Sequence, residues 1–134
     1  MSRNGLALFL CGVGALLGAC GGSASASDET RTIRIEHSAF RPGSLEVNAG
    51  ETVRFVVVND DPIDHEFLIG DLDGQATHES GSEAHHGDKP GEISVAALSS
   101  AETTFTFGAP GRIYFGCHLP GHYAFGMKGA IHVR

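Results

Sequence analysis

The sequence predicts an all-β domain, a sandwich or barrel of seven or eight short strands. Apolar and polar residues alternate with a period of two along several stretches, which is typical of strands that bury one face. The 134 residues include 19 glycines and 5 prolines, and this content of turn-forming residues fits many short strands joined by turns. A chain of this length holds one small domain, which excludes a multidomain enzyme.

Turn-forming residues separate the expected strands. Pro42 with Gly43, and Pro110 with Gly111, are two of these turn signals. The strands are expected at residues 31–37, 44–48, 52–59, 64–70, 92–98, 102–107, 112–117 and 128–133.

Residues 71–91 interrupt this rhythm, because they are polar, acidic and without periodicity. The sequence predicts a long loop here and no amphipathic helix in the folded domain. His78, His85 and His86 are candidate ligands of a second metal site, because flexible imidazole and carboxylate groups bind Cu(II) or Zn(II) readily. A solvated acidic loop is the alternative that we favour, since no ligand spacing is enforced.

The first twenty residues have the organisation of an export signal. Arg3 precedes an apolar stretch, Leu6–Leu17, that is too short to span a bilayer. The run Leu-Gly-Ala-Cys that ends at Cys20 resembles a bacterial lipobox, and this resemblance implies cleavage before Cys20 and a lipid on its sulfur. An ordinary signal peptide and a short buried helix are the alternative interpretations.

These signals divide the chain into three parts. Residues 1–19 are expected to be a lipoprotein signal peptide, and residues 20–30 a flexible linker that begins with the lipidated Cys20. The folded domain is expected at residues 31–134. The protein would then lie outside the cytoplasm, anchored by lipid to a bacterial membrane, in the periplasm or at the cell surface.

Charge and cysteine content exclude two further possibilities. Sixteen Asp and Glu against nine Lys and Arg give a net charge of -7, and no basic stripe is visible, which argues against nucleic acid as a partner. Cys11 and Cys20 lie in the N-terminal segment, so Cys117 is the only cysteine of the expected domain. That domain therefore has no internal disulfide.

One short segment brings three metal-binding side chains together. Cys117 ends an expected strand on the core side. Pro120 and Gly121 suit the second and third positions of a type II turn, which folds His122 back toward Cys117. Met127 follows along the same loop. The loop therefore offers a thiolate, an imidazole and a thioether.

A fourth donor is available from the strand expected at residues 64–70, where His65 shares the inward face with Phe67 and Ile69. An isolated histidine on an apolar face is more often a hydrogen-bonded core residue than a ligand. This histidine is not isolated, because the loop described above supplies partners. Two imidazoles, one thiolate and a weak thioether form a set that stabilises copper in both oxidation states.

Zinc is the first alternative, although zinc normally takes four strong ligands and seldom a thioether. An inert buried thiol among unrelated histidines is the second. A nucleophilic cysteine would need an adjacent base and an orienting third group, and no such signature is visible, so we expect no enzyme. His118 is expected to face solvent beside Cys117 and to bind no metal.

Residues 31–134 resemble a cupredoxin, the plastocyanin, azurin and rusticyanin type of blue copper protein. The similarity is strongest in Tyr-Phe-Gly-Cys-His-Leu-Pro-Gly-His-Tyr-Ala-Phe-Gly-Met-Lys-Gly at residues 114–129, and the segments at 40–55 and 64–67 support it. The resemblance implies a Greek-key β-sandwich or barrel that holds one type 1 copper centre, cycling between Cu(I) and Cu(II).

Carried over to this sequence, the resemblance implies that His65, Cys117 and His122 are equatorial copper ligands and that Met127 is the axial ligand. One position departs from the family pattern. Many cupredoxins have an asparagine directly after the first histidine ligand, where its hydrogen bonds steady the cysteine loop, and this chain has Glu66 there. Asn59 could substitute for it.

The expected function is one-electron transfer between membrane-associated redox proteins. These partners would dock near His122, whose ring would bridge the copper and an apolar surface formed by Leu119, Pro120, Tyr123 and Phe125. We expect a monomer that contacts the membrane through its lipid.

The alternative is an extracytoplasmic copper-binding protein for copper resistance, storage or delivery, and the histidines of residues 71–91 would suit that role. A structural interaction domain without metal is a third class.

Overall fold

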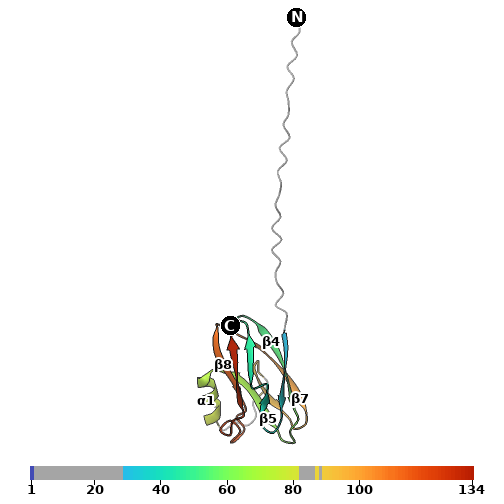
Figure 1. The fold of residues 1–134 in the computed structure, drawn as a ribbon, viewed down its shortest axis with the longest axis vertical. Coiled ribbons are helices and arrows are strands. Elements are labelled where there is room, and N and C mark those ends of the chain that lie inside the picture. The colour runs from blue at the N-terminus through green and yellow to red at the C-terminus, as the bar shows by residue number, and fades with distance from the viewer. Residues whose placement is uncertain (2–28, 82–86, 88) are drawn as a thin grey trace.

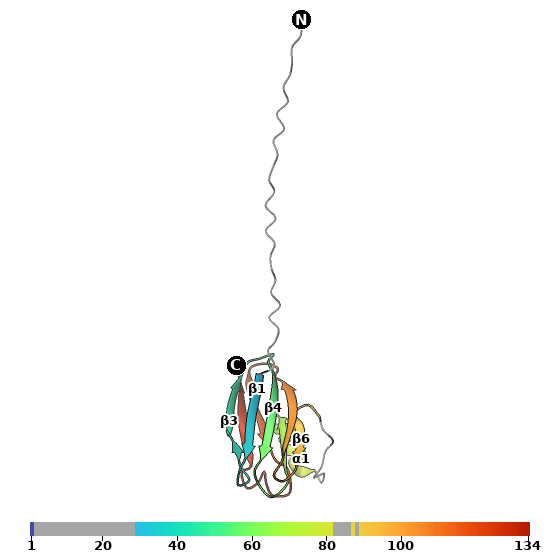
Figure 2. The ribbon, with the colours of Figure 1, turned by 90° about the vertical axis from the view of Figure 1, so that its right-hand side faces the viewer.

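Two β-sheets pack face to face in the part of the chain that the computed structural model describes, which is Met1, residues 29–81, Gly87 and residues 89–134 (Figure 1, Figure 2). The first sheet contains, in spatial order, β2 (Phe40–Arg41), β1 (Glu29–Ile35), β4 (Thr52–Asn59) and β7 (Ser100–Thr106). The second contains β3 (Ser44–Val47), β9 (Lys128–Val133), β8 (Gly111–Gly116), β5 (His65–Gly70) and β6 (Glu92–Val95). The predicted all-β sandwich is confirmed.

The core between the sheets is built around Phe67 of β5. Its ring centroid lies 5.7 Å from that of Phe40, 5.5 Å from that of Phe55 and 5.4 Å from that of Phe115. Such aromatic pairs contribute about 0.5–1.5 kcal/mol each beyond the burial of their area. Phe67 and Phe115 thereby fix β5 and β8 against the first sheet.

Strand direction gathers the candidate ligands at one end of the sandwich. β8 runs antiparallel to both β5 and β9, with Leu68 opposite Gly116 and Gly116 opposite Lys128. The start of β5, the end of β8 and the start of β9 therefore meet, at the opposite end from the C-terminus (Figure 1). His65 and the loop of residues 117–127 lie at this end.

The expectation that residues 71–91 lack a helix is wrong, because α1 (Leu72–Ser80) follows β5 directly. The Asp71 side chain caps this helix by accepting a hydrogen bond from the Gly74 N–H at 2.8 Å. Gln75 is its buried residue, and the Gln75 amide donates to the carbonyl oxygens of Leu68 and Tyr114 at 3.3 and 3.2 Å. The helix docks on β5 and β8 through polar contacts, so it has no apolar stripe that periodicity could reveal.

Glycine permits this docking. Phe115 points into the core, so Gly116 faces the other side of the sheet. A Cβ at Gly116 would lie 2.9 Å from Gln75 Oε1 and 2.6 Å from the Tyr123 ring. Only glycine leaves room for both side chains on this face.

The strand boundaries differ from the predicted ones at several ends. β1 begins at Glu29, inside the expected linker, and it ends at Ile35 because His37 and Ser38 adopt left-handed conformations with φ of 53° and 54°. β6 ends at Val95, three residues before the expected end. The short β2 brings the number of strands in the described residues to nine.

The one helix of the described residues, α1, has nine residues, so a candidate membrane-spanning helix is absent from this part of the chain. The predicted signal peptide and Cys20 lie outside the described residues.

Candidate metal centre

Three donor atoms from two parts of the chain lie close together at the end of the sandwich. His122 Nδ1 is 3.3 Å from His65 Nδ1 and 3.3 Å from Cys117 Sγ, and the third distance, from Cys117 Sγ to His65 Nδ1, is 4.0 Å. Three of the four sequence-predicted ligands are thus brought together. The described part of the chain contains no other group of three His, Cys, Asp or Glu side chains as close.

The size of this triangle fits one metal ion. The point equidistant from the three atoms lies about 2.1 Å from each, within the ~2.0–2.3 Å at which nitrogen and sulfur ligands bind a divalent ion such as zinc. His65 and Cys117 are buried, while His122 is half-buried and reaches the surface of the loop.

The predicted type II turn is present between Leu119 and His122. The His122 N–H donates to the Leu119 carbonyl oxygen at 2.9 Å, and Gly121 supplies the positive φ of 86° that the turn requires. The turn folds the His122 ring back over Cys117, as the sequence indicates.

The backbone of Met127 is hydrogen-bonded to both candidate ligands of the loop, Cys117 and His122. Its N–H donates to the His122 carbonyl oxygen at 3.0 Å, and its own carbonyl oxygen accepts from the Cys117 N–H at 3.1 Å. The Met127 side chain is buried. These bonds close residues 117–127 into a compact loop and place the Met127 backbone between those of Cys117 and His122. Its role as the fourth ligand stays a prediction.

Asp61 contacts a candidate ligand and was not singled out from the sequence. Its Oδ2 lies 3.0 Å from His65 Nε2, and the carboxylate also accepts hydrogen bonds from the N–H groups of His37 and Ser38, each at 2.7 Å. Burial opposes the charge of Asp61, but the backbone hydrogen bonds and His65 outweigh it and hold its pKa below the usual value. A carboxylate four residues before the histidine is the sequence signal that could have revealed this contact.

Glu66 bonds the cysteine loop despite its departure from the family pattern. Its N–H donates to Cys117 Sγ at 3.3 Å, and its Oε2 accepts from the His118 N–H at 3.3 Å. Asn59 does not take this role, contrary to expectation. The Asn59 amide instead donates to carbonyl oxygens of the loops on either side, including that of Ile63 at 2.8 Å, and thereby fixes the chain just before His65.

His118 does not face solvent, so that prediction is wrong. Its Nε2 lies 2.7 Å from Gln75 Oε1 and its Nδ1 lies 2.9 Å from Glu79 Oε2, while the ring stacks on Tyr123 with centroids 4.6 Å apart. Cys117 points into the core and His118 points to the opposite face, but α1 covers that face. Both ring nitrogens of His118 therefore contact side chains of the helix.

Burial sets the protonation of the donors. It raises the pKa of the Cys117 thiol to about 11 and, together with the neighbouring His65, lowers the pKa of His122. Without a cation, the thiol therefore keeps its proton at neutral pH. A metal ion must displace that proton, so its binding weakens as the pH falls.

Of the three candidate ligands of the second metal site, His78 alone lies within the described residues. His78 lies on α1, with Nδ1 3.0 Å from the Gly74 carbonyl oxygen and Nε2 3.5 Å from Glu92 Oε1. His85 and His86 lie outside the described residues.

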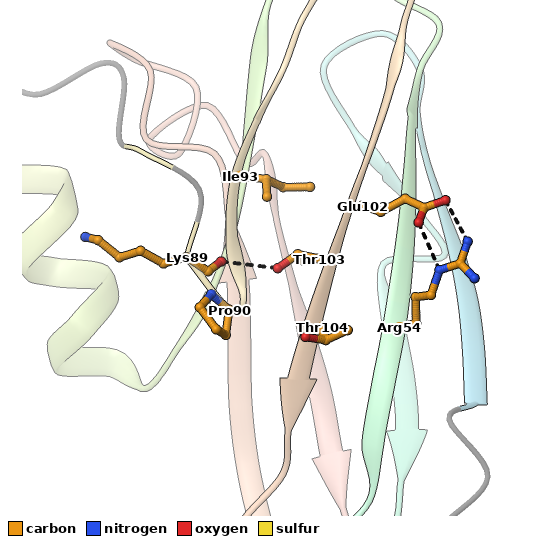
Figure 3. A pocket seen from close by; sticks show the side chains of 7 residues that line it. All are labelled: Arg54, Lys89, Pro90, Ile93, Glu102, Thr103 and Thr104. Atoms are coloured by element: carbon orange, nitrogen blue, oxygen red, sulfur yellow. Dashed lines mark hydrogen bonds and ion pairs between the residues drawn. The ribbon is translucent and has the colours of Figure 1, made fainter.

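A cavity of about 370 Å³ opens on another side of the molecule, between β4, β6 and β7 (Figure 3). Several polar groups of its lining residues already form hydrogen bonds within the protein. Arg54 forms two hydrogen bonds with Glu102, at 2.9 and 2.7 Å, and the Thr103 hydroxyl accepts from the Gly91 N–H and donates to the Lys89 carbonyl oxygen. The candidate metal ligands do not line it.

Comparisons with known proteins agree with this fold. A family described as "Cupredoxin-like domain" matches residues 8–96. The Copper-resistant cuproprotein CopI of Rubrivivax gelatinosus is 36% identical over 85% of this chain and 71% of its own length. The protein of the same name from Pseudomonas aeruginosa is 34% identical over 87% of this chain and 83% of its own.

Solved structures of auracyanins are also similar to this chain. Auracyanin B superposes with a TM-score of 0.68 and 27% identity, over 79% of this chain and 88% of its own. Auracyanin A of Chloroflexus aurantiacus, described as a "blue" copper protein, gives a TM-score of 0.64 and 27% identity, over 78% of this chain and 98% of its own. The sandwich, the ligand triangle and these similarities together establish that the chain belongs to the cupredoxin-like domain family.

Proposed function

We propose that this protein binds one copper ion through His65, Cys117 and His122, with Met127 as the axial donor, and carries single electrons outside the cytoplasm. The observation that carries the proposal is the triangle of two imidazole nitrogens and one thiol sulfur. The sulfur donors suit Cu(I) and the imidazoles suit either oxidation state, so copper bound there can accept one electron from a partner and pass it to another.

The rigidity of the ligands supports this role. Hydrogen bonds from Met127 and from the turn at Leu119 hold the loop, and strand β5 holds His65. Donors that are already close move little when copper changes oxidation state, and a small rearrangement favours rapid electron exchange. Four protein donors also leave no position for a substrate, so we propose no enzymatic role.

Copper resistance, storage or delivery is the second candidate function. The names of the two CopI relatives favour it, since both describe copper-resistant cuproproteins. The two functions share the same metal centre, and they differ in whether the electron or the metal leaves the protein.

The first prediction concerns the thiolate. Copper-loaded wild-type protein should show an intense visible charge-transfer band, and Cys117→Ser should abolish it. The apo fold should survive, because the substitution changes one atom and keeps the rest of the side chain. Absorption and circular dichroism spectroscopy measure the two effects. His78→Gln is the control and should keep the band. An intense band in Cys117→Ser would exclude Cys117 as ligand, and a colourless wild type would favour zinc.

The second prediction concerns Met127. Met127→Leu keeps an apolar side chain of similar volume but removes the thioether, a weak axial donor that favours Cu(II). The variant should keep copper and colour and have a higher reduction potential, measured by spectroelectrochemical titration. An unchanged or lower potential would count against Met127 as a ligand.

Exposed apolar side chains at the metal end support docking of a partner there. Phe125 is 94% exposed, Leu98 71% and Ile63 47%. Leu98 and Ile63 belong to the loops that flank the start of β5. We propose that these three side chains form the docking surface for redox partners.

This surface differs in part from the expected one. Leu119 packs against the core, and Tyr123 stacks on His118. Both are only partly exposed, so Phe125 is the better probe for docking.

The third prediction separates electron transfer from copper handling. Phe125→Asp should slow electron exchange with the native partner by about tenfold or more and leave the copper spectrum intact, because a charge at the centre of a small redox contact disrupts it. Leu72→Asp, at an exposed leucine on α1, is the matched control. Exchange rates are measured by stopped-flow absorbance.

The opposite result would reverse our ranking of the two functions. If Phe125→Asp exchanges electrons normally and deletion of residues 82–88 makes cells copper-sensitive, copper handling is the function. The deletion spares α1 and Lys89, which contact the rest of the domain.

The fourth prediction concerns the membrane. We propose that Cys20 carries the lipid anchor, because it ends the lipobox-like run Leu-Gly-Ala-Cys. The several acyl chains of a lipoprotein would hold the protein firmly at a membrane, whereas a single chain does not. Mass spectrometry of the native protein should find lipid on Cys20, and Cys20→Ser should release the protein or block its processing. Cys11→Ser is the control and should still be lipidated. An unmodified Cys20 in the mature native protein would reject the anchor.

A further inference from the structure

We propose that Asp61 is a positioning residue of the metal centre, which fixes the tautomer of His65 and makes the bound copper prefer Cu(II). The inference rests on the proposed function for its copper part only. It begins from the hydrogen bond of 3.0 Å between Asp61 Oδ2 and His65 Nε2.

Hydrogen bonds hold both the side chain and the backbone of Asp61 in place. Its side chain accepts from the N–H groups of His37 and Ser38, its own N–H donates to Asn59 Oδ1 at 3.0 Å, and its carbonyl oxygen accepts from the Leu98 N–H at 3.0 Å. The residue is 8% exposed. A carboxylate held in this way has a fixed position relative to the His65 ring.

These hydrogen bonds determine which His65 nitrogen carries the proton. Backbone N–H groups can only donate, so the Asp61 oxygens that receive them act as acceptors. Two backbone N–H donors favour the ionised carboxylate, which has no proton to give, so the nitrogen that faces it, His65 Nε2, is the donor. His65 Nδ1 is left with its lone pair, and it is the atom that lies in the ligand triangle.

The carboxylate also changes the strength of the ligand. An imidazole whose N–H donates to a carboxylate is a stronger donor to the metal. A buried negative charge one ring away from the metal is attracted more to a divalent than to a monovalent cation. Asp61 should therefore stabilise Cu(II) more than Cu(I) and lower the reduction potential.

Asp61 links the ligand to a distant part of the chain as well. His37 and Ser38 follow β1 in left-handed conformations, and their N–H groups point at the carboxylate that binds His65. Replacing Asp61 by alanine would leave both N–H groups without this acceptor, so Asp61→Asn is the better test. It keeps one acceptor oxygen and removes the charge.

Asp60→Asn is the matched control. Asp60 precedes Asp61, carries the same charge, and binds Arg34 on the surface, where its side chain is 36% exposed. Both variants change the net charge by the same amount. Only Asp61→Asn changes a group that contacts a metal ligand.

The experiment measures the affinities of both variants for Cu(II), Cu(I) and Zn(II) by competition with chelators. We expect Asp61→Asn to lose about 10–100-fold in Cu(II) affinity and less in Cu(I) affinity, with a higher reduction potential. Asp60→Asn should match the wild type within about twofold, because an exposed charge is screened. Equal losses for both copper ions, or equal effects of the two variants, would overturn the proposal.

A second measurement needs no variant. In the diamagnetic Zn(II) form of the wild type, nitrogen NMR should show a slowly exchanging proton on His65 Nε2. A proton that exchanges at the rate of an exposed histidine would overturn the positioning role. If the copper-loaded wild type is colourless, the proposed function fails, and the Zn(II) affinities and this proton still decide the role of Asp61.

Discussion

The pairing of β5 with β8 is the constraint on which the metal centre depends. His65 begins β5 and Cys117 directly follows β8, so the register that places Leu68 opposite Gly116 also places these two side chains at the same end. A shift of one residue would turn every side chain of β5 to the opposite face. The contacts of Phe67 with three other rings oppose such a shift, because they hold the odd-numbered residues of β5 toward the core.

Once the register is fixed, the loop of residues 117–127 completes the triangle with short-range hydrogen bonds. The protein gathers three donors within 4.0 Å in a site where two of them are buried. Burial raises the pKa of the Cys117 thiol, so a metal ion that binds there must displace the thiol proton. The folded state therefore holds the three donors close together before an ion binds, so little conformational freedom remains to be lost on binding.

The sequence could predict the features that depend on regular patterns. Alternation located the strands, and the Pro120-Gly121 pair located the turn that brings His122 to Cys117. It could not predict α1, because the buried face of that helix is one polar side chain, Gln75, whose hydrogen bonds leave no periodic trace. The burial of His118 could not be predicted either, because it depends on α1. The alternating strand pattern says which face His118 takes but not that a helix covers that face.

Asp61 and Glu66 show a second limit of the sequence. Asp61 lies in the turn-forming run Asn59-Asp60-Asp61-Pro62, so a role in the turn already accounts for its residue type. Its spacing of four residues from His65 is compatible with their contact, but the contact itself depends on where the loops after β1 and β4 lie. Glu66 stands where many cupredoxins have asparagine. Its backbone N–H donates to the Cys117 sulfur, and its carboxylate accepts from the N–H of His118. The residue type at position 66 therefore does not by itself reveal which hydrogen bonds the cysteine loop receives.

The helix gives the metal end an asymmetry that bears on the proposed function. On the face of the second sheet away from the core, His118 is bound to Gln75 and Glu79, and Tyr123 stacks over it. That face is closed by polar contacts with α1. His122 is the half-buried member of the triangle, and the exposed Phe125 lies in the same loop. His122 is therefore the candidate ligand nearest to solvent, and a partner that exchanges electrons through its ring, as we propose, would dock over the loop and away from the helix.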